Sequence, residues 1–379
     1  MYWPERDTLL VFLIALSLRL VSVVVTTFTS LNTYADTDAD KFARYGSQIA
    51  DTILGGSLPA IDPLYIYDVW GAMLSPFWML PGPSRVYARI GMAVVSAAAV
   101  YNVYVIVRSL YSRYAGFISV LPMIFYPSFL FTHTVVLREA MILFGLTAAA
   151  RLLLAPSPKL GAYTKYSLVT LLLGVSSILR RENFVLYVLI LVIGVILEEK
   201  PWERYKRLTQ IASGAIMVTA PLAVLTLGNR VLDQLVFIRQ VRSHGRTAYL
   251  TSVLPNTIPE AVVFSWIGAL YFLYTPFPWM VASIADLIIM VEGLSNIIYT
   301  IAAVTGARIL SRKTLSGTAA LVAGVTVGTI VYGLGTVNVG TAVRHRPMVL
   351  WVIFLFGGVG IAEHIRMRVN FEQLPVDIR

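Results

Sequence analysis

The apolar run LLVFLIALSLRLVSVVVTT, residues 9–27, is long enough to cross a bilayer, which takes roughly 20 apolar residues in a helix. No small-residue cleavage site follows it, so we expect a retained membrane span and not a signal peptide. The run contains one charged residue, Arg19. Its side chain either snorkels to the membrane surface or faces the interior of a helix bundle, where it would meet a carboxylate such as Glu139 or Glu182.

The composition of the whole chain extends this conclusion. Of the 379 residues, 57% are hydrophobic and only 13% are charged. A soluble domain carries about 25% charged residues, and disordered chains combine low hydrophobicity with high net charge, so both classes are excluded. Further apolar runs alternate with short polar joints. We predict an all-α, polytopic transmembrane helical bundle of about ten spans, with residues 1–379 forming a single integral-membrane domain.

The charged residues are few but unbalanced in type. The net charge is +10, and 24 of the 30 basic residues are arginine. Arginine suits bidentate recognition of phosphate or carboxylate, where lysine acts as a point charge. The absence of cysteine excludes disulfides and zinc–thiolate sites. Nucleic acid is not an expected partner, because the chain has no polar fold on which to carry a basic face.

The positive-inside rule predicts an orientation. Placing the N-terminus in the cytoplasm puts five of the six lysines on the cytoplasmic side, provided that residues 261–283 do not cross the membrane. The acidic loop after the first span and several arginine-bearing joints then lie on the other face, where arginine needs a different explanation, such as an anionic ligand. We predict a first outer loop at residues 31–84 and a second at residues 229–260.

The first outer loop contains YADTDADKFARYGSQIA, residues 34–50, in which Asp36, Asp38 and Asp40 alternate. Alternating acids can hold a divalent cation, or one of them can act as a general base, although an Asp-rich stretch is equally typical of a solvated turn. Apolar residues follow at helical spacing, so we predict an amphipathic helix on the outer face with the acids at its N-terminus. There the helix dipole stabilises negative charge, which is a structural benefit on its own.

Three further clusters combine arginine with other polar side chains where apolar runs begin or end. They are Arg138 with Glu139, Arg181 with Glu182, and Arg344 and Arg346 on either side of His345. The last cluster follows a Gly-Thr turn and precedes a proline suited to the first position of a helix, which indicates a compact anion site. The alternative for Arg138 with Glu139 is a snorkelling arginine at the membrane boundary, and the alternative for Arg181 with Glu182 is a tight outer hairpin.

These motifs, together with Tyr45 and Ala50 after the Asp-rich loop and the segment from Tyr126-Pro127-Ser128 to Glu139, resemble those of the GT-C superfamily of membrane glycosyltransferases. The closest resemblance is to prokaryotic members related to protein O-mannosyltransferases and aminoarabinose lipid A transferases, the glycosyltransferase 39 or 83 type. Such enzymes transfer a sugar from a polyprenyl-phosphate carrier to a glycan, lipid or protein acceptor on the outer face of the membrane. The resemblance therefore implies a multi-pass protein of a prokaryotic plasma membrane, with its active site on the non-cytoplasmic face.

The resemblance also implies roles for residues. An Asp of the first outer loop is the base, which would be Asp38 or Asp40, with Asp36 as a third candidate. Some members use a divalent cation, Mg or Mn, for which Asp36 and Asp38 are the candidate ligands. Arginines can stabilise the charge that develops on the departing phosphate, and attack from the opposite side of the sugar predicts inversion. The predicted substrate- and phosphate-binding residues are Arg138, Glu139, Arg181, Glu182, Arg344, His345 and Arg346.

Three other functions fit the same sequence, and the third is a non-catalytic membrane scaffold. An outer-face polysaccharide polymerase or ligase would also handle polyprenyl-linked sugars, but would use the arginine-rich loop 229–260 as its main site. A lipid or solute transporter, or a flippase, needs ionisable residues near the middle of the membrane and usually carries internal repeats. We find no internal repeat, and the charges gather toward one face, so the sequence favours the glycosyltransferase.

Overall fold

The computed structural model describes residues 6–29, 36–155, 160–196, 228, 232–241, 243 and 245–369. Within these ranges the regular structure is helical, apart from one isolated bridge between Ala248 and Asn338. The all-α prediction is therefore confirmed. The first part of the chain forms α1 (Arg6–Phe28), α2 (Asp36–Leu54), α3 (Ile66–Trp78), α4 (Ser84–Leu110), α5 (Arg113–Phe125), α6 (Pro127–His133) and α7 (Glu139–Leu154).

The second part continues the helical arrangement, and residues 232–241 are helical as well. Its named elements are α8 (Ala162–Leu179), η1 (Arg181–Asn183), α9 (Phe184–Ile196), α11 (Ile258–Tyr274), η2 (Pro278–Met280), α12 (Ile284–Ser311), α13 (Leu315–Gly335), α14 (Val339–His345) and α15 (Pro347–Val369).

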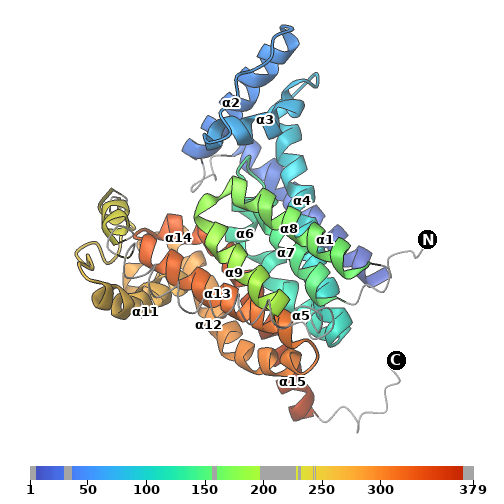
Figure 1. The fold of residues 1–379 in the computed structure, drawn as a ribbon, viewed down its shortest axis with the longest axis vertical. Helices are drawn as coiled ribbons and strands as arrows, with labels where there is room; N and C mark the ends of the chain where they lie inside the picture. The colour runs from blue at the N-terminus through green and yellow to red at the C-terminus, as the bar shows by residue number, and fades with distance from the viewer. Residues whose placement is uncertain are drawn as a thin grey trace.

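In the described part of the chain, five helices are long and apolar enough to cross a membrane: α1, α4, α12, α13 and α15. The pair α5 and α6 makes a sixth if its 64° bend is counted as one broken span. The structure thus supports a multi-pass membrane protein with five or six candidate spans among the described residues, and the expected count of about ten stays a prediction. The predicted loop helix is present as α2, which pairs with α3 and projects with it from one end of the bundle (Figure 1).

The end of the bundle farthest from α2 and α3 gathers the polar start of α1 and several helix termini. Asp7 near the start of α1 lies 3.3 Å from the Nε atoms of both Arg108 and Arg113. Lys313, just after α12, donates a hydrogen bond to the carbonyl of Leu110 at the end of α4. We call this the Asp7 end, and the opposite end the Asp38 end.

Close packing of helices in this bundle depends on glycine where α12 crosses α15. A Cβ atom on Gly306 would come within 1.9 Å of the carbonyl oxygen of Phe356, and one on Gly360 within 2.0 Å of the carbonyl oxygen of Ala302. Small residues at such contacts let two backbones approach closely, which is how helices gain packing energy where lipid offers little hydrophobic drive.

Arg19 lies fully buried in the bundle interior, so the second of its two predicted orientations is the observed one. The expected carboxylate partner Glu139 is wrong, because the acceptors are neutral oxygens: Nε donates to Ser96 Oγ at 2.8 Å and Nη2 donates to the carbonyl of Met123 at 2.9 Å. In a regular helix that carbonyl would accept from the residue four positions later, but Pro127 has no N–H. The guanidinium therefore occupies a carbonyl that a helix break leaves open.

Candidate functional site

Glu139, the first residue of α7, is the centre of a charged cluster at the Asp38 end. Its carboxylate is fully buried, and Oε1 accepts hydrogen bonds from Arg344 Nε at 2.7 Å and from Arg180 Nη2 at 3.2 Å. Arg344 comes from α14 and Arg180 from the joint between α8 and η1. A buried carboxylate of this kind is stable only when it is paired, and here two guanidinium groups neutralise it.

The cluster reaches the surface through Asp38 on α2. Arg344 Nη1 donates to Asp38 Oδ2 at 2.6 Å, and the Asp38 side chain is 37% exposed. One guanidinium thus bridges the buried carboxylate of Glu139 and the accessible carboxylate of Asp38. Asp38 and Glu139 are 101 positions apart in the sequence, and both accept hydrogen bonds from Arg344, which lies on α14. We refer to Asp38, Glu139, Arg180, Arg344 and His345 as the Asp38–Glu139 cluster.

The charge of Arg344 is secured by this arrangement. Burial alone would lower the pKa of its guanidinium, but the attraction of Glu139 and the hydrogen bond to Asp38 outweigh burial and raise the pKa above its usual value. The group therefore remains a cation. Within the described residues Nη2 of Arg344 donates no hydrogen bond, although a guanidinium carries five N–H donors.

His345 extends the cluster on its inner side. Its Nε2 lies 3.1 Å from Arg180 Nη2, and its ring packs 5.2 Å from that of Tyr332. Because arginine can only donate, Nε2 must accept this hydrogen bond, which places the ring proton of a neutral His345 on Nδ1. Arg180 also approaches the Tyr332 hydroxyl at 3.4 Å, and that hydroxyl donates to Asn183 Oδ1 at 2.7 Å.

The short helix α14 carries Arg344 and His345, and its N-terminal end contacts the loop that contains Thr247 and Tyr249. Asn338 caps its N-terminus by accepting from the Gly340 N–H at 2.8 Å, as Asn at this position commonly does. Backbone hydrogen bonds join Tyr249 N to the Val337 carbonyl at 2.8 Å and Val339 N to the Thr247 carbonyl at 3.1 Å. Since seven residues make a marginal helix in isolation, these contacts fix the position of Arg344.

Four other predicted site residues lie near the cluster. Arg138 donates from Nη1 to the carbonyl of Leu179 at 2.6 Å, where α8 ends. Arg181 is exposed and donates to the carbonyl of Pro63 at 2.9 Å. Asp40 forms a surface ion pair with Arg85, at the start of α4.

Arg346, the fourth, is fully buried on the side of α14 that faces α11. It donates from Nη2 to Thr275 Oγ1 at 2.6 Å and from Nε to the carbonyl of Phe272. Pro276 leaves that carbonyl without its usual helical donor, as Pro127 does for the carbonyl that Arg19 occupies. Burial lowers the pKa of Arg346 to about 10. Its observed contacts brace α11 against the last span.

The side chains of Asp36 and Glu182 lie outside the described part of the structure. The predicted cation ligands, Asp36 and Asp38, can therefore be compared with the fold only through Asp38. Among the side chains that are described, no three His, Asp or Glu residues stand close enough together to hold a metal ion. Asp38 offers one carboxylate whose visible partners are Arg344 and, at 3.5 Å, the Tyr67 hydroxyl.

Arg180 is the cluster residue that the sequence reasoning did not select, since it chose the neighbouring Arg181. A signal for Arg180 exists in the spacing of buried positions along α8. Val169, Leu173 and Ser176 are buried at intervals of four and three residues, and the next interval of four falls on Arg180. This spacing indicates an inward position at 180, and in the structure Arg180 lies inward at the extended residue where α8 ends, while Arg181 is exposed.

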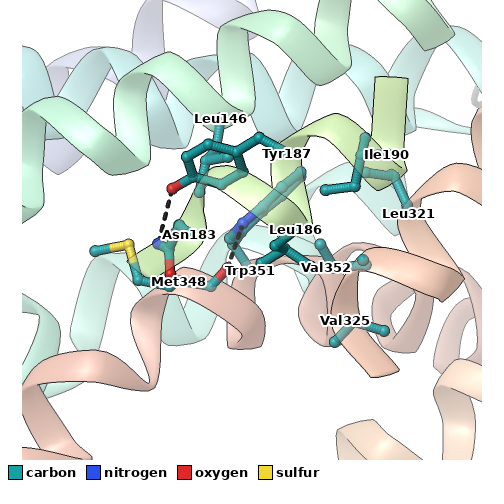
Figure 2. Close-up of a pocket in the computed structure, with 11 residues that line it drawn as sticks. Leu146, Asn183, Leu186, Tyr187, Ile190, Leu321, Val325, Met348, Trp351 and Val352 are labelled. Atoms are coloured by element: carbon teal, nitrogen blue, oxygen red, sulfur yellow. Dashed lines mark hydrogen bonds between the residues drawn. The ribbon is translucent and has the colours of Figure 1, made fainter. Parts of the chain in front are cut away.

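A small pocket adjoins the cluster through Asn183, between α7, α9, α13 and α15 (Figure 2). Its volume of about 20 Å³ is close to that of a single water site. The lining is apolar except around Asn183, whose amide donates to the Tyr187 hydroxyl at 2.9 Å. The pocket is a packing gap behind the cluster, too small for a sugar or a lipid headgroup.

The fold and the site together define a class, an α-helical protein with several membrane-length apolar helices and a cluster of paired arginines and acids at one end. Comparisons with protein-family models, curated proteins and solved structures found no match.

Proposed function

We propose that the protein is a membrane glycosyltransferase that transfers a sugar from a polyprenyl-phosphate carrier to an acceptor hydroxyl, with inversion, at the Asp38 end. The observation that carries this proposal is the accessible carboxylate of Asp38, held at 2.6 Å by Arg344. A general base and a phosphate-binding cation are the two groups that such a transfer requires. In the proposed orientation the Asp38 end faces the non-cytoplasmic side of a prokaryotic plasma membrane.

In the proposed reaction Asp38 takes the proton of the acceptor hydroxyl as that oxygen attacks the anomeric carbon. The bond between the anomeric carbon and the phosphate oxygen breaks, and its electron pair stays on the departing polyprenyl phosphate. Arg344 stabilises the charge that develops there, since its cationic state is secured by Glu139 and its Nη2 is not engaged by any described residue. Arg180 adds a second positive charge on the same side of Glu139.

Asp38 is favoured over Asp40 as the base by their different partners. Asp38 bonds Arg344, which also bonds the buried carboxylate of Glu139. Asp40 instead pairs with the half-exposed Arg85 at the start of α4. Exposed ion pairs of the second kind contribute little energy and organise little around them. Asp38 is therefore the better candidate of the two acids, because it belongs to the same charged cluster as Arg344 and Glu139.

The test is turnover by the full-length protein in lipid nanodiscs, with a panel of polyprenyl-phosphate pentoses and hexoses as donors and membrane glycolipids and short glycans as acceptors. We expect Asp38→Asn to lower the rate about 100-fold or more, the scale of general-base catalysis. Asp51→Asn, a change of the same type on the exposed face of α2, is the matched control and should retain wild-type turnover. Equal turnover in the Asp38→Asn and Asp51→Asn proteins contradicts the proposal.

The same preparation separates the alternatives. A polymerase or ligase would rely on residues 229–260, but Arg239 there is buried against three backbone carbonyls and Arg246 forms a bidentate pair with Asp286. Both arginines therefore already bind protein groups. A flippase would move a labelled polyprenyl-phosphate sugar between leaflets without cleaving it, which a leaflet-protection assay detects.

A further inference from the structure

Three tyrosines form a compact cluster on the projecting pair of helices. Tyr45 comes from α2, Tyr65 precedes α3 and Tyr67 lies in its first turn. The ring centroids are 5.4 Å apart for Tyr65 and Tyr67, 5.5 Å for Tyr45 and Tyr67, and 5.8 Å for Tyr45 and Tyr65. Each ring thus contacts the other two, and we call the three residues the tyrosine cluster.

The cluster is accessible from outside the bundle. Tyr65 is 43% exposed and the other two rings are half-buried, while α2 and α3 project from one end of the bundle, where α3 also packs against α4 (Figure 1). The hydroxyls of Tyr45 and Tyr65 lie 3.3 Å apart. Grouped aromatic rings that remain exposed differ from the scattered apolar residues of any surface and indicate a binding site.

The cluster is also firmly supported and continuous with the candidate active site. Phe42, which is almost fully buried, packs behind Tyr67 with ring centroids 4.9 Å apart. The hydroxyl of Tyr67 lies 3.5 Å from Asp38 Oδ1. A molecule lying on the face of the cluster would therefore meet the Asp38 carboxylate at its edge.

We propose that the tyrosine cluster binds a carbohydrate and that the acceptor of the proposed transfer is a sugar hydroxyl. This inference rests on the proposed function, because it assigns the acceptor of the same site. One face of a sugar ring consists of C–H groups, which pack on the electron-rich face of an aromatic ring, while its hydroxyls bond polar groups at the rim. The phenol groups and the exposed ammonium of Lys41, 6.0 Å from the Tyr67 ring centroid, supply such a rim.

The chemistry of the cluster favours a sugar over the other acceptor classes. A lipid chain would leave three phenol hydroxyls and nearby charges without suitable partners. A peptide acceptor needs backbone hydrogen-bonding groups along an extended path, whereas the cluster consists of aromatic rings and their hydroxyls. A sugar uses both properties at once, and a hydroxyl of a ring lying on Tyr67 would be placed beside Asp38.

The test measures binding without any transfer. Full-length Asp38→Asn protein in nanodiscs is mixed with methyl glycosides of hexoses, pentoses, amino sugars and uronic acids, and saturation-transfer-difference NMR identifies those that bind. We expect enhancement on the C–H protons of one ring face for at least one glycoside. Tyr65→Ala should lower its affinity about two- to tenfold, the range set by aromatic contacts, and Tyr65→Phe should retain most of it. Tyr114→Ala, at an exposed tyrosine of α5 at the Asp7 end, is the matched control.

Two results would overturn the inference: no saturation transfer to any glycoside, or a signal that survives Tyr65→Ala. A peptide or lipid acceptor identified by turnover would do the same. Because the binding measurement needs neither donor nor turnover, its result is independent of the transferase assay. Carbohydrate binding without transfer would retain the tyrosine cluster as a sugar site while rejecting the proposed function, and transfer without binding would do the reverse.

Discussion

Arg344 and Glu139 are joined by a 2.7 Å hydrogen bond although they lie 205 positions apart in the sequence. The same carboxylate oxygen of Glu139 also accepts from Arg180. One atom therefore ties the start of α7 to α14 and to the joint after α8. The position of the guanidinium that bonds Asp38 is set by this buried contact.

Replacing Glu139 by Gln should destabilise the protein strongly. The amide leaves the guanidinium groups of Arg180 and Arg344 close together without their shared counter-charge, and removing one partner of a buried ion pair costs about 3–5 kcal/mol. Thermal unfolding of the protein in detergent or nanodiscs measures the change. Asp51→Asn should stay within about 0.5 kcal/mol of wild type, as expected for an exposed surface site.

A double-mutant cycle isolates the contact from general damage. If Glu139 and Arg180 interact directly, the loss of stability in Glu139→Gln with Arg180→Gln should be smaller than the sum of the two single losses by about 1 kcal/mol or more. Additive losses would mean that the hydrogen bond of 3.2 Å carries no coupling and that Glu139 is held by Arg344 alone.

Substituting Lys for Arg344 should impair the site while keeping its charge. Arg344 donates from Nε to Glu139 and from Nη1 to Asp38, and the single ammonium of lysine cannot reproduce that fork. Under the proposed function we expect the KM for the polyprenyl-phosphate donor to rise about tenfold and kcat to fall. Arg181→Lys, an exposed change beside the cluster, provides the comparison, and equal effects of the two changes would argue against a special role for Arg344.

Arg19 offers a test of structure without any assumption about function. Its guanidinium donates to Ser96 Oγ and to the carbonyls of Ala15 and Met123, all buried. Arg19→Lys retains the positive charge but cannot donate in the same three directions. Each buried acceptor left without a donor costs about 1–3 kcal/mol of folding stability. The midpoint of unfolding should fall accordingly. Arg85→Lys, at the surface pair with Asp40, should change stability by less than about 1 kcal/mol.

Tyr65 should resist deprotonation. The hydrogen bond with Tyr45 is the main cause that raises the pKa of Tyr65 from 10.0 to about 12. Because the folded state holds this proton more tightly than the unfolded state, the contribution of Tyr65 to stability is present below pH 10 and is lost as the pH rises toward 12. The difference in absorbance at tyrosinate wavelengths between wild type and Tyr65→Phe measures the titration. In a Tyr45→Phe background its midpoint should shift down toward 10, and an unchanged midpoint would exclude the hydrogen bond as the cause.

Much of the fold could be predicted from the sequence because the length and hydropathy of an apolar run indicate a helix without reference to the rest of the chain. Hydropathy identified the long spans such as α1 and α4, and apolar spacing identified the amphipathic α2. The contacts that form at helix breaks were harder to predict. Pro127 and Pro276 are visible in the sequence, but the arginines that occupy the carbonyls they leave open come from distant segments.

The candidate site was predictable in part for the same reason. Asp38, Glu139 and Arg344 stood out as charged residues beside apolar runs, and the structure brings them together. The choice between Arg180 and Arg181 depends on the exact residue at which α8 ends, because Arg180 has an extended backbone between α8 and η1. Some of the numerous arginines have a structural role instead. Arg19, Arg138 and Arg346 donate to backbone carbonyls at helix ends and breaks.

The bond between Arg19 and the Met123 carbonyl also fixes the register of α1 against α5. In a bilayer the lipid is as apolar as helix side chains, so burial alone distinguishes poorly between one axial position of a span and the next. Sliding α1 by a single turn, about 5.4 Å, would separate the guanidinium from the open carbonyl and leave both without partners. The open carbonyl at the Pro127 break therefore favours the observed axial position of α1 against α5.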